Sequence, residues 1–62
     1  MNLDKYVMLK ANIKSFNGIV SIGSIKNRFN VESEDAEEML NNLIQEGIVE
    51  PYSTDGTNFK IK

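Results

Sequence analysis

The chain of 62 residues contains no cysteine and no histidine. Without cysteine, no disulfide can hold the fold together, and without histidine a zinc site is not expected. A chain of this length makes one domain near the lower size limit for independent folding. We therefore predict a single domain, residues 1–62, that depends on one compact apolar core and carries no cofactor or metal.

Long apolar runs and a secretion signal are also missing. No apolar stretch approaches the length that crosses a bilayer. The first five residues lack the basic and then apolar pattern of a signal peptide. Hydrophobic residues make up 40% and charged residues 26% of the chain, which is typical of a soluble globular domain. We expect a cytoplasmic protein that does not enter a membrane.

Basic residues are absent from the whole middle of the chain. No lysine or arginine lies between Arg28 and Lys60. The same segment contains eight acidic residues, which are Glu32, Glu34, Asp35, Glu37, Glu38, Glu46, Glu50 and Asp55. The net charge of −2 gives the chain no overall attraction to nucleic acid. The uneven distribution of charge is therefore more informative than its sum.

The first regular pattern predicts a helix over residues 3–16. Apolar residues recur there at spacings of three and four, which is the period of one helical face. The residues of this face are Leu3, Tyr6, Leu9, Ile13 and Phe16. Asn2 can cap the start, and Asn17 with Gly18 supplies the left-handed geometry that ends a helix.

Val7, Met8 and Ala11 widen the apolar face of this first helix. One interpretation places the helix at the centre of a small core, contacted on two sides. The other is that Val7 and Met8 form the contact of a homodimer.

Two short elements are predicted next. The β-branched run at residues 19–21 is too brief to be more than an edge strand. Ser21 then caps a short helix over residues 22–29, and Asn30 is suited to a left-handed stop. Val31 is expected to enter the core at the following turn.

The clearest helix pattern covers residues 33–46. Its inward stripe follows the spacing i, i+3, i+4, i+7 and i+8 and consists of Ala36, Met39, Leu40, Leu43 and Ile44. Gly47 ends the helix. The acidic residues of its first turn suit the positive end of the helix dipole.

The C-terminal segment predicts a β-hairpin with strands over residues 48–52 and 57–61. The turn between them contains Asp55 and Gly56, and Asp-Gly is a strong local hairpin signal. Pro51 confines its strand to an edge or bulge position. We expect three side chains of the hairpin to lie over the helices, namely those of Tyr52, Phe59 and Ile61.

This order of elements resembles a winged helix-turn-helix domain. Val31 stands before the cap, small or apolar residues follow at positions 36, 39, 40 and 43, and Gly47 with two aliphatic residues enters the hairpin. That is the register of the DNA-reading helix in the superfamily. The resemblance covers essentially the whole chain. It implies an α+β, mostly α, fold of three helices with a short strand and a C-terminal β-hairpin wing.

Two groups within the superfamily are similar to the passage from the third helix into the wing. Residues 43–51 with the turn at Asp55 and Gly56 resemble the gamma domain of the FtsK/SpoIIIE DNA translocases, which recognises chromosomal orienting sequences. Residues 49–57 resemble the dissimilatory sulfite reductase D protein.

The resemblance implies that the chain binds duplex DNA as a small regulatory or accessory domain. The reading surface would be the outer face of the third helix, with residues Glu37, Glu38, Asn41, Asn42 and Gln45. Amide side chains can read adenine edges, and glutamate can accept a hydrogen bond from cytosine. Lys26 and Arg28 would contact the phosphate backbone. The wing residues would be Thr54, Asp55, Gly56 and Asn58.

The same acidic helix also suits a second interpretation, in which the partner is a protein. DNA-reading members commonly carry arginine or lysine at the positions of Glu37, Asn41 and Asn42, and often at the wing tip. An acidic face instead complements a basic protein surface, or it can mimic DNA in the binding site of another protein. The plainest interpretation is that Lys26, Arg28 and the acids form an ordinary solvated surface.

Catalysis is not expected. The chain has no histidine or cysteine to act as a base or nucleophile, and it has no glycine-rich phosphate loop. The acids Glu34, Asp35 and Glu38 do not have the spacing of a calcium-binding loop. The sequence therefore predicts a binding protein rather than an enzyme.

Overall fold

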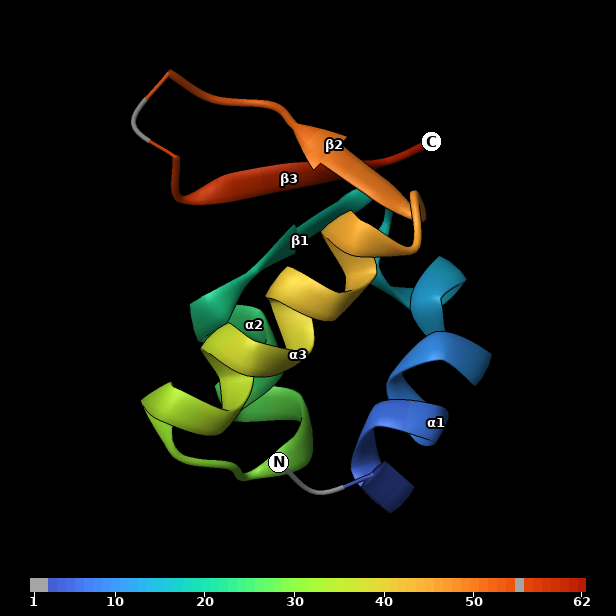
Figure 1. Ribbon diagram of the computed structural model, residues 1–62, viewed down its shortest axis with the longest axis vertical. Helices are drawn as coiled ribbons and strands as arrows, with labels where there is room; N and C mark the ends of the chain where they lie inside the picture. Colours follow the sequence, from blue (N-terminus) through green and yellow to red (C-terminus); the bar gives the residue numbers. More distant parts are fainter. Residues whose placement is uncertain (1–2, 55) are drawn as a thin grey trace.

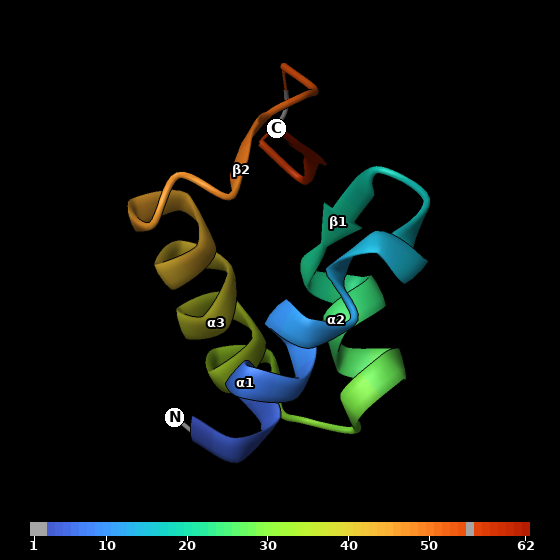
Figure 2. The same cartoon turned by 90° about the vertical axis from the view of Figure 1, so that its right-hand side faces the viewer.

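The computed structural model describes residues 3–54 and 56–62 and has an α+β, mostly helical architecture (Figure 1). Three α-helices pack beneath a small antiparallel sheet in the described part of the chain. The elements are α1 (Leu3–Ala11), the 3₁₀-helix η1 (Ile13–Phe16), β1 (Ile19–Ser21), α2 (Ile22–Phe29), α3 (Ser33–Gln45), β2 (Val49–Pro51) and β3 (Asn58–Ile61). The turned view in Figure 2 shows α1 between α3 on one side and α2 on the other.

The sheet has the strand order β1-β3-β2, so the last strand in sequence is the central one. β3 pairs antiparallel with both neighbours, and Lys60 lies opposite Ile19 on one side and Glu50 on the other. β1 is an edge strand, as its length predicts. Pro51 ends the other edge strand, where its missing N–H leaves no ladder bond unmade.

The first helix is shorter than its apolar pattern predicts. α1 ends at Ala11, and the chain tightens into η1 rather than continuing as an α-helix to residue 16. Asn12 explains the break, because its side-chain amide donates a 2.9 Å hydrogen bond to the Met8 carbonyl beside the backbone bond from its own N–H. Ile13 and Phe16, three residues apart, then lie on the same side of η1 and reach the core.

Leu3 is a second departure from the expected stripe. Its residue surface is 66% exposed, whereas Tyr6 and Leu9 are buried. Leu3 lies one turn before Val7, which is 60% exposed, so both belong to the outer side of α1. Asn2, the expected cap, lies outside the described residues.

The predicted caps are confirmed where the chain turns sharply. Ser21 and Ser24 form a reciprocal capping box at the start of α2. Asn17 and Asn30 adopt left-handed backbone conformations, with φ values of 58° and 54°. Gly47 has φ of 76° directly after α3, a value that favours glycine.

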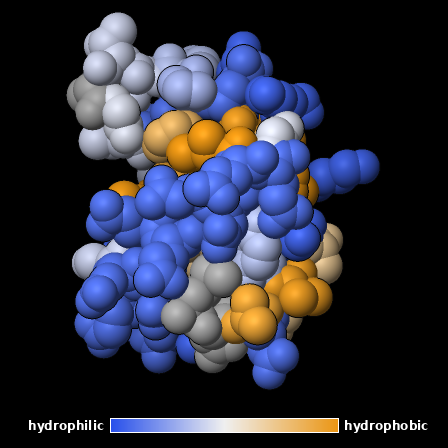
Figure 3. Space-filling view, viewed as in Figure 1, coloured by the Kyte–Doolittle hydropathy of each residue, from blue (hydrophilic) through white to orange (hydrophobic). Residues whose placement is uncertain are grey.

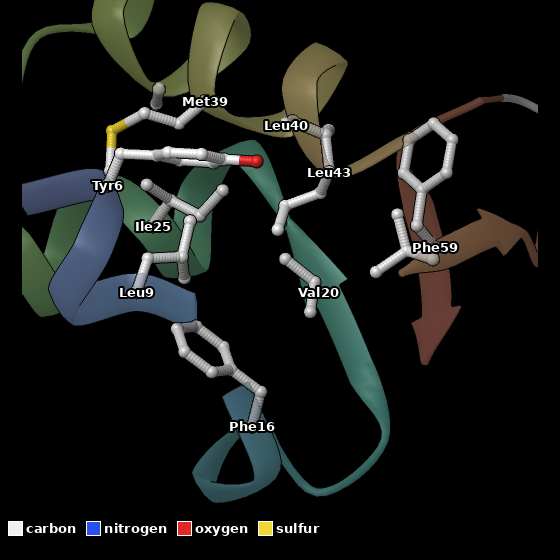
Figure 4. Packing of buried hydrophobic residues seen from close by; sticks show 11 residues of the cluster. Tyr6, Leu9, Phe16, Val20, Ile25, Met39, Leu40, Leu43 and Phe59 are labelled. Carbon is white, nitrogen blue, oxygen red and sulfur yellow. The ribbon is translucent and has the colours of Figure 1, made fainter. Parts of the chain in front are cut away.

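The core draws on every helix and strand, and Figure 4 shows its side chains converging between α1, α2, α3 and the sheet. Its buried members are Tyr6, Leu9, Phe16, Val20, Ile25, Ala36, Met39, Leu40, Leu43, Val49 and Phe59. The inward stripe of α3 is confirmed, with Ile44 partly buried against this cluster. Val31 packs against the core, as expected, and so do Ile22 and Phe29.

The hairpin forms as expected, but one of its aromatic residues does not lie over the helices. Phe59 is buried and Ile61 packs against the core, whereas Tyr52 is 63% exposed. Tyr52 directly follows β2, and its backbone N–H donates to the Asn58 carbonyl at 3.0 Å. The prediction that Tyr52 covers the helices is therefore wrong. Successive residues of an extended strand face opposite sides of the sheet, so Tyr52 faces away from the side on which Val49 is buried.

Candidate functional site

The outer face of α3 is an uncovered row of acids and amides. Glu34, Glu38, Asn41 and Gln45 are exposed and recur at spacings of three and four residues, opposite the buried stripe. In Figure 3, hydrophilic side chains spread across the centre of the face on which α3 lies in Figure 1. Every charged side chain on this helix is a carboxylate. The row can accept and donate hydrogen bonds but offers no positive charge.

Two predicted site residues lie on the flanks of α3 rather than at its centre. Asn42 is half-buried and lies one turn before Glu46, which contacts α1. Asn42 therefore belongs to the flank nearest α1. Glu37 is exposed and lies one turn from Leu40, on the opposite flank. The structure thus brings Glu38, Asn41 and Gln45 together and separates Glu37 from Asn42.

Glu46 connects α3 to α1. Its carboxylate accepts a hydrogen bond from the Tyr6 hydroxyl and an ion-paired one from Lys10 Nζ at 3.1 Å. Lys10 also lies 5.0 Å from the centre of the Tyr6 ring. The hydrogen bond from Tyr6, assisted by Lys10, lowers the pKa of Glu46. Burial and the hydrogen bond to Glu46 raise the pKa of Tyr6 above its ordinary value of 10.0.

Arg28 is engaged away from α3. Its Nη1 donates a 2.6 Å hydrogen bond to Ser15 Oγ, and its guanidinium carbon lies 4.6 Å from the centre of the Phe16 ring. Phe16 in turn stacks with Phe29, with ring centroids 6.4 Å apart. Arg28 therefore joins α2 to η1, on the side of α2 away from α3 (Figure 2).

Lys26 does not accompany Arg28. Both side chains are exposed, but residues two apart on a helix point in different directions. Since Arg28 turns towards η1, Lys26 lies on another side of α2. The predicted pair of phosphate contacts is therefore split between two surfaces.

The β2–β3 hairpin, which was predicted to be a wing, is polar in its described residues, and its Lys60 is paired. Thr54 and Gly56 are exposed, while Asn58 is half-buried and its N–H donates to Ser53 Oγ at 3.2 Å. Asp55 lies outside the described residues. Lys60 lies 3.7 Å from Glu50 across the ladder. The described residues of the predicted wing thus offer hydrogen-bonding groups at the hairpin.

An exposed apolar surface lies on α1. Leu3, Val7 and Met8 are 66%, 60% and 54% exposed, respectively. Figure 3 shows hydrophobic side chains gathered over the part of the molecule where α1 lies in Figure 1. Single exposed apolar residues are normal on a protein surface, but α1 exposes three of them within nine residues.

Sequence reasoning did not identify the contacts of Ser15, Tyr6 and Glu46. Ser15 is a small polar residue with no local signal, and its partner lies 13 positions away. Glu46 and Tyr6 are 40 positions apart. The only sequence signal for this pair was a tyrosine on the inward face of α1, since a buried tyrosine hydroxyl usually finds a polar partner.

The described residues form no pocket, and they contain no group of three acidic side chains arranged to hold a metal ion. None of the helices in residues 3–54 and 56–62 has the length and hydropathy of a membrane span. Comparison with protein-family models gave no match, and comparisons with curated proteins and with solved structures found no similar chain.

Proposed function

We propose that this chain is a winged helix-turn-helix binding module. The support comes from the order of elements, the strand order β1-β3-β2 and the sequence register of residues 31–49. In this proposal α2 and α3 form the helix-turn-helix, and the β2–β3 hairpin is the wing. The module binds a macromolecule and has no catalytic role.

The leading ligand in this proposal is duplex DNA. The observation that carries it is the uncovered outer face of α3, where Asn41 and Gln45 lie side by side with Glu38. Amides at the centre of such a face match the edges of adenine in the major groove, and a carboxylate matches the amino group of cytosine. The wing adds further polar groups at Thr54 and Asn58.

The test is an amide NMR titration of the whole chain with a mixed-sequence DNA duplex, at about 50 mM and about 200 mM salt. We expect shifts of α3 and hairpin resonances that weaken as salt rises. The Asn41→Ala, Gln45→Ala variant removes the reading groups without changing charge and should lose sequence preference. Absence of shifts at the lower salt concentration, where phosphate contacts are strongest, would contradict DNA binding.

A basic protein surface is the second candidate ligand. The specific observation in its favour is that α3 bears only negative charge, while Arg28 is engaged at η1. Complementary charge would steer a basic partner to this face. The same NMR titration with a lysine-rich peptide tests this candidate. Shifts confined to α3 that are abolished in Glu37→Lys, Glu38→Lys would favour it, whereas unchanged shifts in that variant would exclude the acidic face.

The same module can also pair with a second copy of itself through α1. Val7 and Met8 are exposed on the side of α1 that faces away from the core, and Leu3 extends the surface they form. Pairing of two such surfaces would bury apolar area that one copy leaves in water.

A further inference from the structure

Positive and negative charge are separated in the sequence, and the fold keeps them separate in space. Residues 5–31 contain five basic residues and no acid. They form η1, β1, α2 and most of α1. The segment between Arg28 and Lys60 forms α3 and β2 and leads into β3, and all of its charged residues are acidic. In Figure 2, α3 lies on one side of α1, and η1 with α2 lies on the other.

η1 exposes part of the basic segment of the chain. Its inward residues are Ile13 and Phe16, which leaves Lys14 and Ser15 on the solvent side. Arg28 reaches this side from α2 and donates to Ser15 Oγ at 2.6 Å and to the Ser15 carbonyl at 3.5 Å. Arg28 and Lys14 therefore belong to adjoining segments, and both side chains are exposed.

The end of β3 reaches the same corner. The Ile61 N–H donates to the Gly18 carbonyl at 2.9 Å, which joins the turn after η1 to the strand end. Lys62 follows directly, is exposed, and is held by its N–H bond to the Ile48 carbonyl at 3.0 Å. A third basic residue is thus placed beside the turn that follows η1.

Two acids among the described residues are paired with lysines outside this corner. Glu46 is paired with Lys10 at 3.1 Å, and Glu50 is paired with Lys60 at 3.7 Å. Within the described residues, Lys14, Arg28 and Lys62 have no carboxylate partner. Their charge is therefore available to an anion from outside the molecule.

We propose that Lys14, Arg28 and Lys62, here called the basic corner, bind the phosphate backbone of duplex DNA. The proposal rests on DNA binding as the function and names a surface other than the outer face of α3. Arg28 is prepared for this role, because Ser15 and the Phe16 ring fix its guanidinium while other N–H donors still face solvent. Contacts of this kind position a duplex without reading its sequence.

The basic corner also resolves the conflict between DNA binding and an acidic α3. If α3 supplied the phosphate contacts, its carboxylates would repel the duplex. Phosphate contacts made by the basic corner would not depend on α3, whose charged residues are all acids. The salt dependence of binding would then come from η1, α2 and the end of β3.

The test measures the affinity of the whole chain for a mixed-sequence DNA duplex as a function of salt, in two matched variants. Lys14→Gln removes a charge from the basic corner. Lys5→Gln removes the same charge from α1, outside the basic corner. We expect Lys14→Gln to weaken binding and lower the slope of log affinity against log salt by about 1, with no change for Lys5→Gln. Lys62→Gln should add a similar decrease.

Ser15→Ala gives a second measurement at constant charge. It removes the side-chain anchor of Arg28, so affinity should fall although the net charge does not change. Circular dichroism would establish that each variant is folded.

The outcomes separate this inference from the proposed function. Binding that depends on Lys26, Asn41 and Gln45 but not on Lys14 or Lys62 would overturn the basic corner and leave DNA binding through α3 in place. Absence of binding by the unsubstituted chain at about 50 mM salt would overturn both.

Discussion

At the scale of single residues, Glu46 makes the contact that holds α1 against α3. One carboxylate oxygen accepts from Tyr6 and the other from Lys10, so two residues of α1 depend on one acid just beyond the end of α3. The fold achieves this by ending α3 at Gln45 and turning at Gly47, which leaves Glu46 beside the first helix.

The lowered pKa of Glu46 predicts a pH-dependent stability. A carboxyl whose pKa is lower in the folded state stabilises the fold above its unfolded pKa of about 4.5 and loses that contribution as pH falls through the folded value. Glu46→Gln should therefore unfold more easily than the unsubstituted chain near neutral pH. The two should converge in acid, as measured by urea denaturation at several pH values.

Tyr6→Phe is the matched partner variant, because it removes only the hydroxyl. It should reproduce most of the Glu46→Gln effect near neutral pH. Since the pKa of Tyr6 is raised in the folded state, its contribution is complete below the unfolded pKa of about 10 and is lost as pH rises through the higher folded pKa. A stability difference between Glu46→Gln and the unsubstituted chain that stays constant down to strong acid would contradict the role given to this contact.

The sequence predicted which apolar side chains are buried better than it predicted which polar side chains contact each other. The apolar members of the core could be chosen from spacing alone, because a buried leucine needs only an inward direction. Arg28 could not be placed in this way. Its exposure was expected, but its direction is set by Ser15 and Phe16, which are local to η1 and distant from α2 in sequence.

At the scale of elements, boundaries followed local chemistry wherever that chemistry was strong. The hydroxyl of Ser21 caps the start of α2. Asn30 and Gly47 end helices because they adopt the left-handed backbone conformation that the turn needs. The break at Asn12 was missed because the apolar spacing continues through it. A 3₁₀ turn can keep two apolar residues inward after the α-helix has ended.

The capping box of α2 yields a prediction at this scale. Ser21→Ala removes the hydroxyl that accepts from the Ser24 N–H at 3.2 Å. Loss of a serine cap should lower the free energy of unfolding by roughly 1 kcal/mol. Ser33→Ala, at an exposed position of α3, is the control and should change it by less than about 0.5 kcal/mol. Equal effects of the two variants in urea denaturation would show that the cap contributes nothing specific.

At the scale of the whole molecule, separated charge and an exposed apolar surface give the chain three distinct sides. α3 is acidic, the basic corner is cationic, and the outer side of α1 is apolar. The charge separation was visible in the sequence, since the acids and bases occupy different segments. Its arrangement in space required the fold, because Arg28 contacts Ser15 of η1 and Ile61 of β3 contacts Gly18 only in the folded chain.

The apolar side of α1 predicts self-association. Sedimentation velocity over a range of protein concentrations should show a mass that rises towards a dimer. Val7→Lys, Met8→Lys should remain a monomer at all concentrations, because each copy would place charge in the contact. Two lysines introduced at Asn27 and Asn41, which are exposed and lie outside α1, provide a control with the same change in charge. A monomeric mass for the unsubstituted chain at the highest concentration would exclude pairing through Val7 and Met8.

The central position of β3 has a consequence for the order in which the fold is made. β1 and β2 each pair with β3 and lie on opposite sides of it, so neither has a strand partner until residues 58–61 are present. As the chain is synthesised from its N-terminus, the three helices can associate first through contacts that are mostly short in sequence. β1 then has no strand partner during the synthesis of almost forty residues, roughly two to eight seconds at ordinary rates of elongation. The sheet therefore closes in one late step, when a single strand fills the space between two that were made before it.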